Sequence, residues 1–357
     1  MMPLLTLLVV LLQSLVVPDL GPPVRTALPN TPAEVSILRA GIALYDQGRY
    51  DEAITRFEEV LMANPDNVSA MYETALTYSK KGELQKAFDL AGRGAAFHSP
   101  ALPQFYGLIG NVLDGNGEPQ RAVEVYKKGL EVAPNAGTLH YNLAVTYRTS
   151  LKDRAAAKAA LKQGALVDPN HSGIQILLAL MFAEDDFKTP ALLAASRFLV
   201  LEPGSARTVQ GYNIWRTLLN GNAVPAAGGT IQIRVNRGQS KEEGDLAALD
   251  LDISMSKALA VKTREGKSEI ESMAWQLDSL FKIYSTRQPG DDKSAFVWTY
   301  YMPYFVEMQQ KNHVEAFVYF ANQRTNLPGV REWLTNNRDR VNALLDWSRN
   351  YPWPKGQ

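Results

Sequence analysis

The feature that most constrains the fold is a spacing of small residues, aromatic residues and prolines that recurs about every 34 residues along the chain. In residues 40–65, Gly41 is followed twelve positions later by Ala53, and then by Phe57 and Pro65. Further prolines stand at nearly constant steps, at Pro100, Pro134, Pro169 and Pro203. Self-similarity at this period is typical of a helical solenoid, in which each repeat supplies one pair of helices.

The first copy shows how such a pair would pack. Small residues at Gly41 and Ala53 allow two antiparallel helices to cross closely, and Phe57 fills the space between them. Gly48 is suited to the turn that joins the two helices. The sequence Thr-Pro-Ala-Glu at residues 31–34 places a cap residue, a proline and an acid where a helix begins, so the first helix is predicted to start there.

Four more copies follow in register, with an alanine at position 91 and a leucine at position 161 where the first copy has an aromatic residue. The matching residues are Ala75, Tyr78, Gly82 and Ala87 in the second copy; Gly110, Leu113, Gly117, Ala122, Tyr126, Gly129 and Pro134 in the third; Ala144, Tyr147, Ala157, Leu161, Gly164 and Pro169 in the fourth; and Ala179, Phe182, Ala191, Ala195, Phe198 and Pro203 in the fifth. The amphipathic stretch 205–220 is predicted to be a helix that covers the last apolar face.

This pattern resembles the tetratricopeptide repeat family, with about five repeats over residues 34–205. The resemblance implies a right-handed superhelix of paired helices, whose first helices line a concave groove that binds peptide segments of partner proteins. The predicted fold class is therefore mostly all-α. A solenoid with its capping helix is expected over residues 32–221, followed by a mainly helical domain over residues 230–357.

The resemblance also suggests which side chains face the groove. The six candidates are Tyr72, Asn111, Asp114, Tyr141, Asn142 and Arg148. Family members that grip an acidic carboxyl terminus use a cluster of lysine, arginine and asparagine, but Leu38 and Tyr72 stand here where a lysine would be needed. We therefore expect an aromatic and amide-rich groove for an extended peptide. The alternative is that these six are ordinary solvated helix residues.

The amino terminus carries an apolar run, Leu4 to Val17, of about fourteen residues. A bilayer takes roughly 20 residues to span, so the run is too short for that and suits the core of a signal peptide. No Lys or Arg precedes Arg25, and no cleavage site is obvious. Residues 1–20 are thus expected to be a signal peptide or another apolar segment. The former implies a periplasmic, secreted or membrane-associated protein, and the alternative is a buried helix packed on the solenoid. The proline-rich residues 21–31 are typical of an extended linker.

After Gly221 the helical period breaks, and Ile231, Ile233 and Val235 alternate with polar residues as in a strand. Residues 245–256 are ambiguous, because their alternation allows a β-hairpin while their Ala, Leu and Lys content favours a helix. We favour the helix. A capping box at Ser268 and Glu271 predicts a core helix over 268–284, and one last helix is predicted over 330–349. Residues 298–328 could also form a decayed sixth hairpin.

Little in the sequence points to catalysis. The chain has no cysteine, which excludes thiolate chemistry. Its formal net charge of zero argues against broad nucleic-acid binding. Asp250 and Asp252 are the best catalytic candidates, but they would share a face only on a strand. The four histidines show no metal-ligand spacing, and nucleotide motifs are absent.

We therefore expect a non-enzymatic scaffold that binds other proteins or peptides, without cofactor or metal. The alternative is that the carboxy-terminal domain is an enzyme or small-ligand module, for which the repeats recruit a substrate or partner. A cavity lined by converging polar groups in residues 230–357 would favour that alternative.

Overall fold

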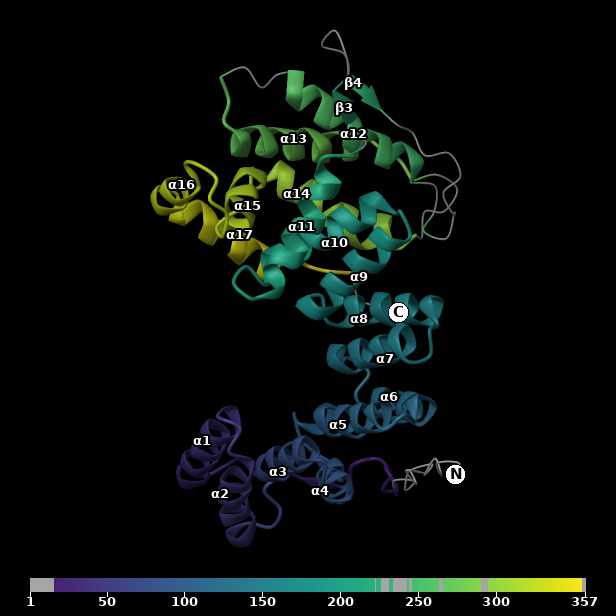
Figure 1. Ribbon diagram of the computed structural model, residues 1–357, viewed down its shortest axis with the longest axis vertical. Helices are drawn as coiled ribbons and strands as arrows, with labels where there is room; N and C mark the ends of the chain where they lie inside the picture. Colours follow the sequence, from purple (N-terminus) through teal and green to yellow (C-terminus); the bar gives the residue numbers. More distant parts are fainter. Residues whose placement is uncertain are drawn as a thin grey trace, which may run out of the picture. The chain divides into compact units, whose positions relative to one another are not determined.

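The computed structural model describes residues 16–221, 223–225, 231–233, 243, 246–262, 266–289 and 295–354. Over these residues the fold is all-α, as predicted, with seventeen α-helices and two pairs of very short strands (Figure 1). The chain divides into two compact units between Ala157 and Lys158, and each is described by itself. The predicted domain boundary near residue 221 stays a prediction.

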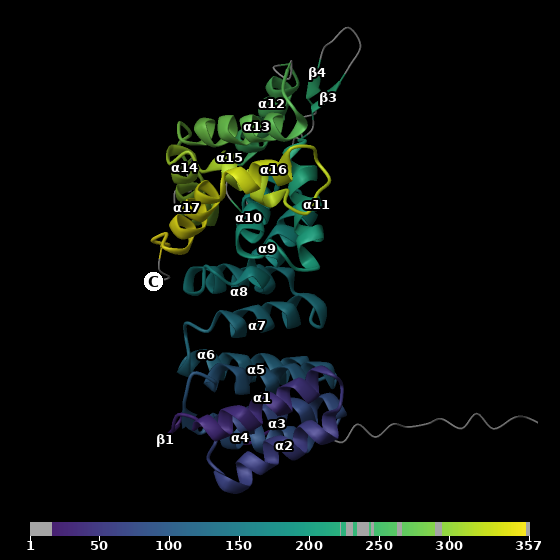
Figure 2. The same cartoon turned by 90° about the vertical axis from the view of Figure 1, so that its left-hand side faces the viewer.

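The first unit is a series of helical hairpins. Helices α1 and α2, α3 and α4, and α5 and α6 pack as pairs, and each pair also contacts the helix that follows it (Figure 2). The helices are α1 (Pro32–Asp46), α2 (Tyr50–Ala63), α3 (Val68–Lys81), α4 (Leu84–Ala95), α5 (Leu102–Gly115), α6 (Pro119–Val132), α7 (Gly137–Thr149) and α8 (Arg154–Val167), the last of which crosses into the second unit.

The local signals that predicted these hairpins are confirmed. Thr31 caps α1, its side chain accepting from the Glu34 amide while the Glu34 carboxylate accepts from the Thr31 amide at 2.6 Å. Phe57 is fully buried against the backbone of Gly41, as the close crossing of α1 and α2 requires. Gly48 joins the two helices with a φ of 74°, a conformation that favours glycine.

The segment predicted as a linker is extended and anchored to the first unit. Strand β1 (Arg25–Thr26) pairs in parallel with β2 (Phe97–His98), and the amides of Val24 and Arg25 donate to the carbonyl of Ala96 at 2.9 and 3.0 Å. Leu20 is buried. Residues 1–15, which hold most of the predicted signal segment, lie outside the described residues, so that expectation stays a prediction.

The second unit is built around α10 (Lys188–Leu201), which contacts α9, α11, α12, α15 and the π-helical turn η2. Every residue from Thr189 to Val200 is buried. The remaining elements are α9 (Ser172–Glu184), α11 (Arg207–Leu219), β3 (Ala223–Pro225), β4 (Ile231–Ile233), α12 (Ala247–Lys262), α13 (Glu269–Tyr284), η2 (Val297–Tyr301), α14 (Met302–Gln310), α15 (Val314–Ala321), α16 (Val330–Asn336) and α17 (Arg338–Arg349). The predicted capping helix, α11, therefore covers only part of the surface of α10.

Two predictions for this unit are confirmed and one is wrong. The ambiguous stretch is helical in α12, and the strand pattern corresponds to β4, which pairs antiparallel with β3. The single last helix is instead interrupted at Asn337, whose φ of −122° and ψ of 33° depart from helical values.

The alternative of a sixth repeat hairpin over 298–328 does not match the packing. Helices α14 and α15 each pack against α13, whereas the helices of a repeat hairpin pack mainly on each other. In the part of the chain that the structure describes, no helix is both long and apolar enough to cross a membrane.

Candidate functional site

The six groove candidates lie on three neighbouring helices of the first unit. Tyr72 is on α3, Asn111 and Asp114 are on α5, and the other three are on α7. Helix α5 contacts both α3 and α7, so the candidates come from one continuous set of helices. All six are at least partly accessible, and Asn111 is exposed.

Two of the candidates are held in place by hydrogen bonds. The Asn111 Oδ1 atom accepts from the hydroxyl of Tyr126 at 2.7 Å, and the Asp114 Oδ2 atom accepts from the hydroxyl of Thr146 at 2.8 Å. Burial raises the pKa of the Tyr126 phenol, which therefore stays protonated and able to donate. The second oxygen of Asp114 is buried and has no hydrogen-bond partner among the described residues.

Two further candidates, Tyr72 and Asn142, are in close packing contact with neighbouring helices. The ring of Tyr72 meets that of Phe105 edge to face, with centroids 5.7 Å apart. The amide nitrogen of Asn142 lies over Gly107, where a β-carbon would come within 3.3 Å of it. Tyr141 and Arg148 are partly buried on α7. No sequence pattern indicated Thr146 or Tyr126 as partners, because they reach the candidates only through contacts between helices.

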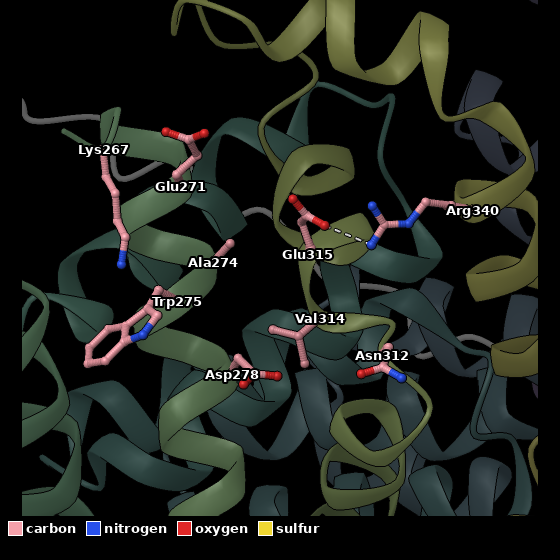
Figure 3. A pocket seen from close by; sticks show the side chains of 9 residues that line it. All are labelled: Lys267, Glu271, Ala274, Trp275, Asp278, Asn312, Val314, Glu315 and Arg340. Atoms are coloured by element: carbon pink, nitrogen blue, oxygen red, sulfur yellow. Dashed lines mark ion pairs between the residues drawn. The ribbon is translucent and has the colours of Figure 1, made fainter. Parts of the chain in front are cut away.

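A second candidate is a cavity of about 430 Å³ in the second unit. Figure 3 shows Ala274 and Val314 between the charged side chains that line it. Its lining residues are Lys267, Glu271, Ala274, Trp275, Asp278, Asn312, Val314, Glu315 and Arg340. This is a cavity with converging polar groups, the observation that would favour a ligand-binding role for this part of the chain.

The aspartate pair has structural roles. On helix α12, Asp250 accepts hydrogen bonds from the amide and hydroxyl of Thr189 at 2.8 and 2.7 Å, at the amino-terminal end of α10. Asp252 forms an ion pair with Arg287, with 2.6 Å between Oδ1 and Nη2. A carboxylate at a helix amino terminus satisfies free amides and suits the helix dipole. The two groups thus serve different elements, and they form no catalytic pair.

The described histidine contacts also have a structural role. His171 Nδ1 accepts from the Ile174 amide at 3.2 Å and caps α9. Burial lowers the pKa values of His140, His171 and His313, which favours their neutral forms. Among the described residues, no group of three or more His, Asp or Glu side chains is placed to hold a metal ion.

Comparison with known proteins places the repeats in a family. Residues 38–103, 103–136 and 137–171 match the tetratricopeptide repeat. Among curated proteins, the chain is 26% identical over 157 residues to BBSome complex member bbs-4 of Caenorhabditis elegans, covering 44% of this chain and 34% of that protein. It is 30% identical over 97 residues to small glutamine-rich tetratricopeptide repeat-containing protein 2 of Mycosarcoma maydis, covering 27% of each. The chain thus spans about a third or less of the length of these relatives.

Solved structures are similar only in part. A thermophilic tetratricopeptide repeat protein of Thermus thermophilus aligns at 27% identity with a TM-score of 0.41, covering 52% of this chain and 98% of that one. PilF of Pseudomonas aeruginosa aligns at 14% identity with a TM-score of 0.39, covering 71% and 93%. The assignment therefore rests on the matched residues and on the helical hairpins of the first unit, and it identifies residues 38–171 as tetratricopeptide repeats.

Proposed function

We propose that this protein is a non-enzymatic scaffold that binds an extended peptide segment of another protein along α3, α5 and α7. The observation that carries the proposal is the position of Tyr72, Asn111, Asp114 and Asn142 on α3, α5 and α7, of which α5 contacts the other two. Proteins with these repeats typically mediate protein–protein interaction, and the repeat fold is generally non-enzymatic. The absence of catalytic activity remains a prediction.

The chemistry of these side chains favours a peptide backbone over a charged terminus. Carboxamides offer both a donor and an acceptor to an extended main chain, and tyrosines provide large contact area at low entropic cost. The lysine cluster used against acidic carboxyl termini is missing at positions 38 and 72.

The name of one relative, a BBSome complex member, describes a component of a protein assembly, which agrees with a scaffold role. We also propose that the protein acts outside the cytoplasm or at a membrane surface. That part of the proposal is supported by the apolar run from Leu4 to Val17.

The groove is tested with a phage-displayed library of random peptides selected on the full-length protein. We expect selected peptides to bind the wild type and to lose about tenfold or more in affinity for the double variant Tyr141→Ala/Asn142→Ala. Lys128→Ala, an exposed change on the second helix of its hairpin, serves as the control and should leave affinity unchanged. Equal affinity for all three proteins would contradict the groove.

A second candidate function is favoured by the cavity in Figure 3: the carboxy-terminal part would bind a ligand of its own. Its volume lies within the range of small-molecule and side-chain pockets.

A further inference from the structure

The cavity of the second unit is lined by both apolar and charged side chains. Ala274 on α13 and Val314 on α15 line it beside three carboxylates and two cationic side chains (Figure 3). The carboxylates are Glu271, Asp278 and Glu315, and the cations are Lys267 and Arg340. The lining therefore carries one more negative than positive charge.

One of the cations is already engaged. Arg340 forms an ion pair with Glu315, with 2.7 Å between Nη2 and Oε2, and its guanidinium lies 5.1 Å from the centre of the Trp333 ring. These contacts hold Arg340 and Glu315 at one side of the cavity, where their charges largely cancel (Figure 3). The other side contains Glu271 and Asp278 against Lys267 alone.

The remaining carboxylates, Glu271 and Asp278, each accept hydrogen bonds from neighbouring side chains. Glu271 accepts from the amide and hydroxyl of Ser268 at 2.8 and 2.7 Å, which holds the pKa of its carboxyl below the usual value. Asp278 accepts from Gln309 Nε2 at 3.3 Å, which is a long hydrogen bond. Both carboxylates therefore keep lone pairs for another donor.

Lys267 shows what kind of group the cavity accepts. Its ammonium lies 5.3 Å from the centre of the Trp275 ring, within the range of a cation–π interaction. The lysine is exposed, and it follows Gly266 just before α13 begins. Leaving this position costs an exposed lysine little, so an incoming cation can replace it over the indole.

We propose that this cavity binds a lysine or arginine side chain of a protein partner, in place of Lys267. The aliphatic stem would lie on Ala274 and Val314, and the cationic head would lie over Trp275, on the side of the cavity that contains Glu271 and Asp278. The chemistry is that of Lys267 itself, which is a lysine side chain carried on a peptide chain. This site is separate from the peptide groove of the first unit, and the proposal does not depend on that groove.

The test uses the full-length protein and three blocked pentapeptides, acetyl-Gly-Gly-X-Gly-Gly-amide, in which X is lysine, norleucine or glutamate. Binding is followed by NMR through the indole N–H signal of Trp275, assigned with the variant Trp275→Phe. We expect the lysine peptide to shift this signal in a saturable way, and the norleucine and glutamate peptides to leave it unchanged. Equal binding of norleucine, stronger binding of glutamate, or no response to lysine would overturn the proposal.

Substitutions then separate a cation site from a site for anions or zwitterions. Lys267→Ala removes the competing cation and should tighten binding of the lysine peptide about two- to fivefold, whereas Asp278→Asn should weaken it by a similar factor. Lys282→Ala, an exposed change on the same helix and outside the cavity, is the matched control and should have no effect. Weaker binding by Lys267→Ala would show that the lysine recruits a negative group, and it would refute the proposal.

Discussion

The ring of Phe57 lies so close to the backbone of Gly41 that a β-carbon there would fall within 3.0 Å of three ring atoms. Gly110 and Tyr126 repeat this relationship in the third hairpin, with the same separation of sixteen residues. The helices of a pair can approach this closely only because the first helix has no side chain where the aromatic ring of the second lies. This steric relationship explains why glycines and aromatics recur in the sequence.

We predict that Gly110→Ala destabilises the first unit by about 1–3 kcal/mol, because the added methyl group overlaps the buried ring of Tyr126. The measurement is urea-induced unfolding followed by circular dichroism.

Gly115→Ala is the matched control, since it lies on the same helix and its β-carbon would meet no atom within 4 Å. It should leave stability unchanged or raise it by up to about 1 kcal/mol through helix propensity. An equal loss for both variants would mean that the loss at Gly110 comes from the backbone and has no connection with the ring.

The anchoring of residues 16–30 also depends on a glycine. A β-carbon at Gly92 would come within 2.5 Å of Pro18 Cβ and 2.6 Å of Pro18 Cγ. We predict that Gly92→Ala loosens this segment, so that the amides of Val24 and Arg25 exchange hydrogen with solvent about tenfold faster or more. Gly21→Ala, whose β-carbon has open space, is the control and should keep the wild-type rates.

Stability should fall at low pH through Glu34. Hydrogen bonds from Thr31, Asn64 and Asn67 lower the pKa of this carboxyl to about 2, from 4.5. Because the folded-state pKa is lowered, the stabilisation is present above pH 4.5 and is lost as the pH falls towards 2.

We therefore predict that Glu34→Gln costs about 1 kcal/mol at pH 7, and that its deficit against the wild type shrinks as the pH falls from 4.5 towards 2. Urea unfolding at a series of pH values measures the difference. Glu124→Gln, an exposed change on α6, controls for the loss of one negative charge. A deficit independent of pH would show that the carboxylate's charge contributes nothing.

The sequence was sufficient for features that depend on neighbouring residues or on the repeat. Helix starts at Thr31 and Ser268 follow from local capping boxes, and the hairpins follow from the small and aromatic positions. The pairing of β1 with β2 could not be predicted, because its hydrogen bonds come from the backbone and leave no side-chain pattern. The break at Asn337 had only a weak signal, an asparagine pair inside an otherwise helical stretch.

The two candidate sites also differ in how far the sequence predicts them. The family resemblance indicated the groove candidates, which the structure has on α3, α5 and α7, since each occupies a fixed position in a repeat. The cavity in Figure 3 draws its charges from α13, α15 and α17 and from Lys267 just before α13, and no local pattern links these. Only tertiary packing brings Trp275 and Glu315 to one cavity.

A fully buried arginine organises the second unit. Arg197 donates to Ser348 Oγ at 2.5 Å and to Asn170 Oδ1 at 2.7 Å, and its guanidinium lies 4.8 Å from the centre of the Trp353 ring. The partners that hold it are neutral side chains and a backbone carbonyl. The planar fork of the guanidinium, more than its charge alone, therefore suits this position.

We predict that Arg197→Lys destabilises the second unit by about 2–3 kcal/mol. A lysine keeps the charge, but its donors all belong to one nitrogen, whereas Ser348 and Asn170 are bonded by two separate nitrogens of the guanidinium, and it has no planar group to stack on Trp353. Arg349→Lys is the matched control, because the ion pair of Arg349 with Asp346 is exposed, and it should cost about 0.5 kcal/mol or less. Thermal and urea unfolding measure both variants. If Arg197→Lys lost no more stability than Arg349→Lys, the guanidinium geometry of Arg197 would not contribute to the stability of the second unit.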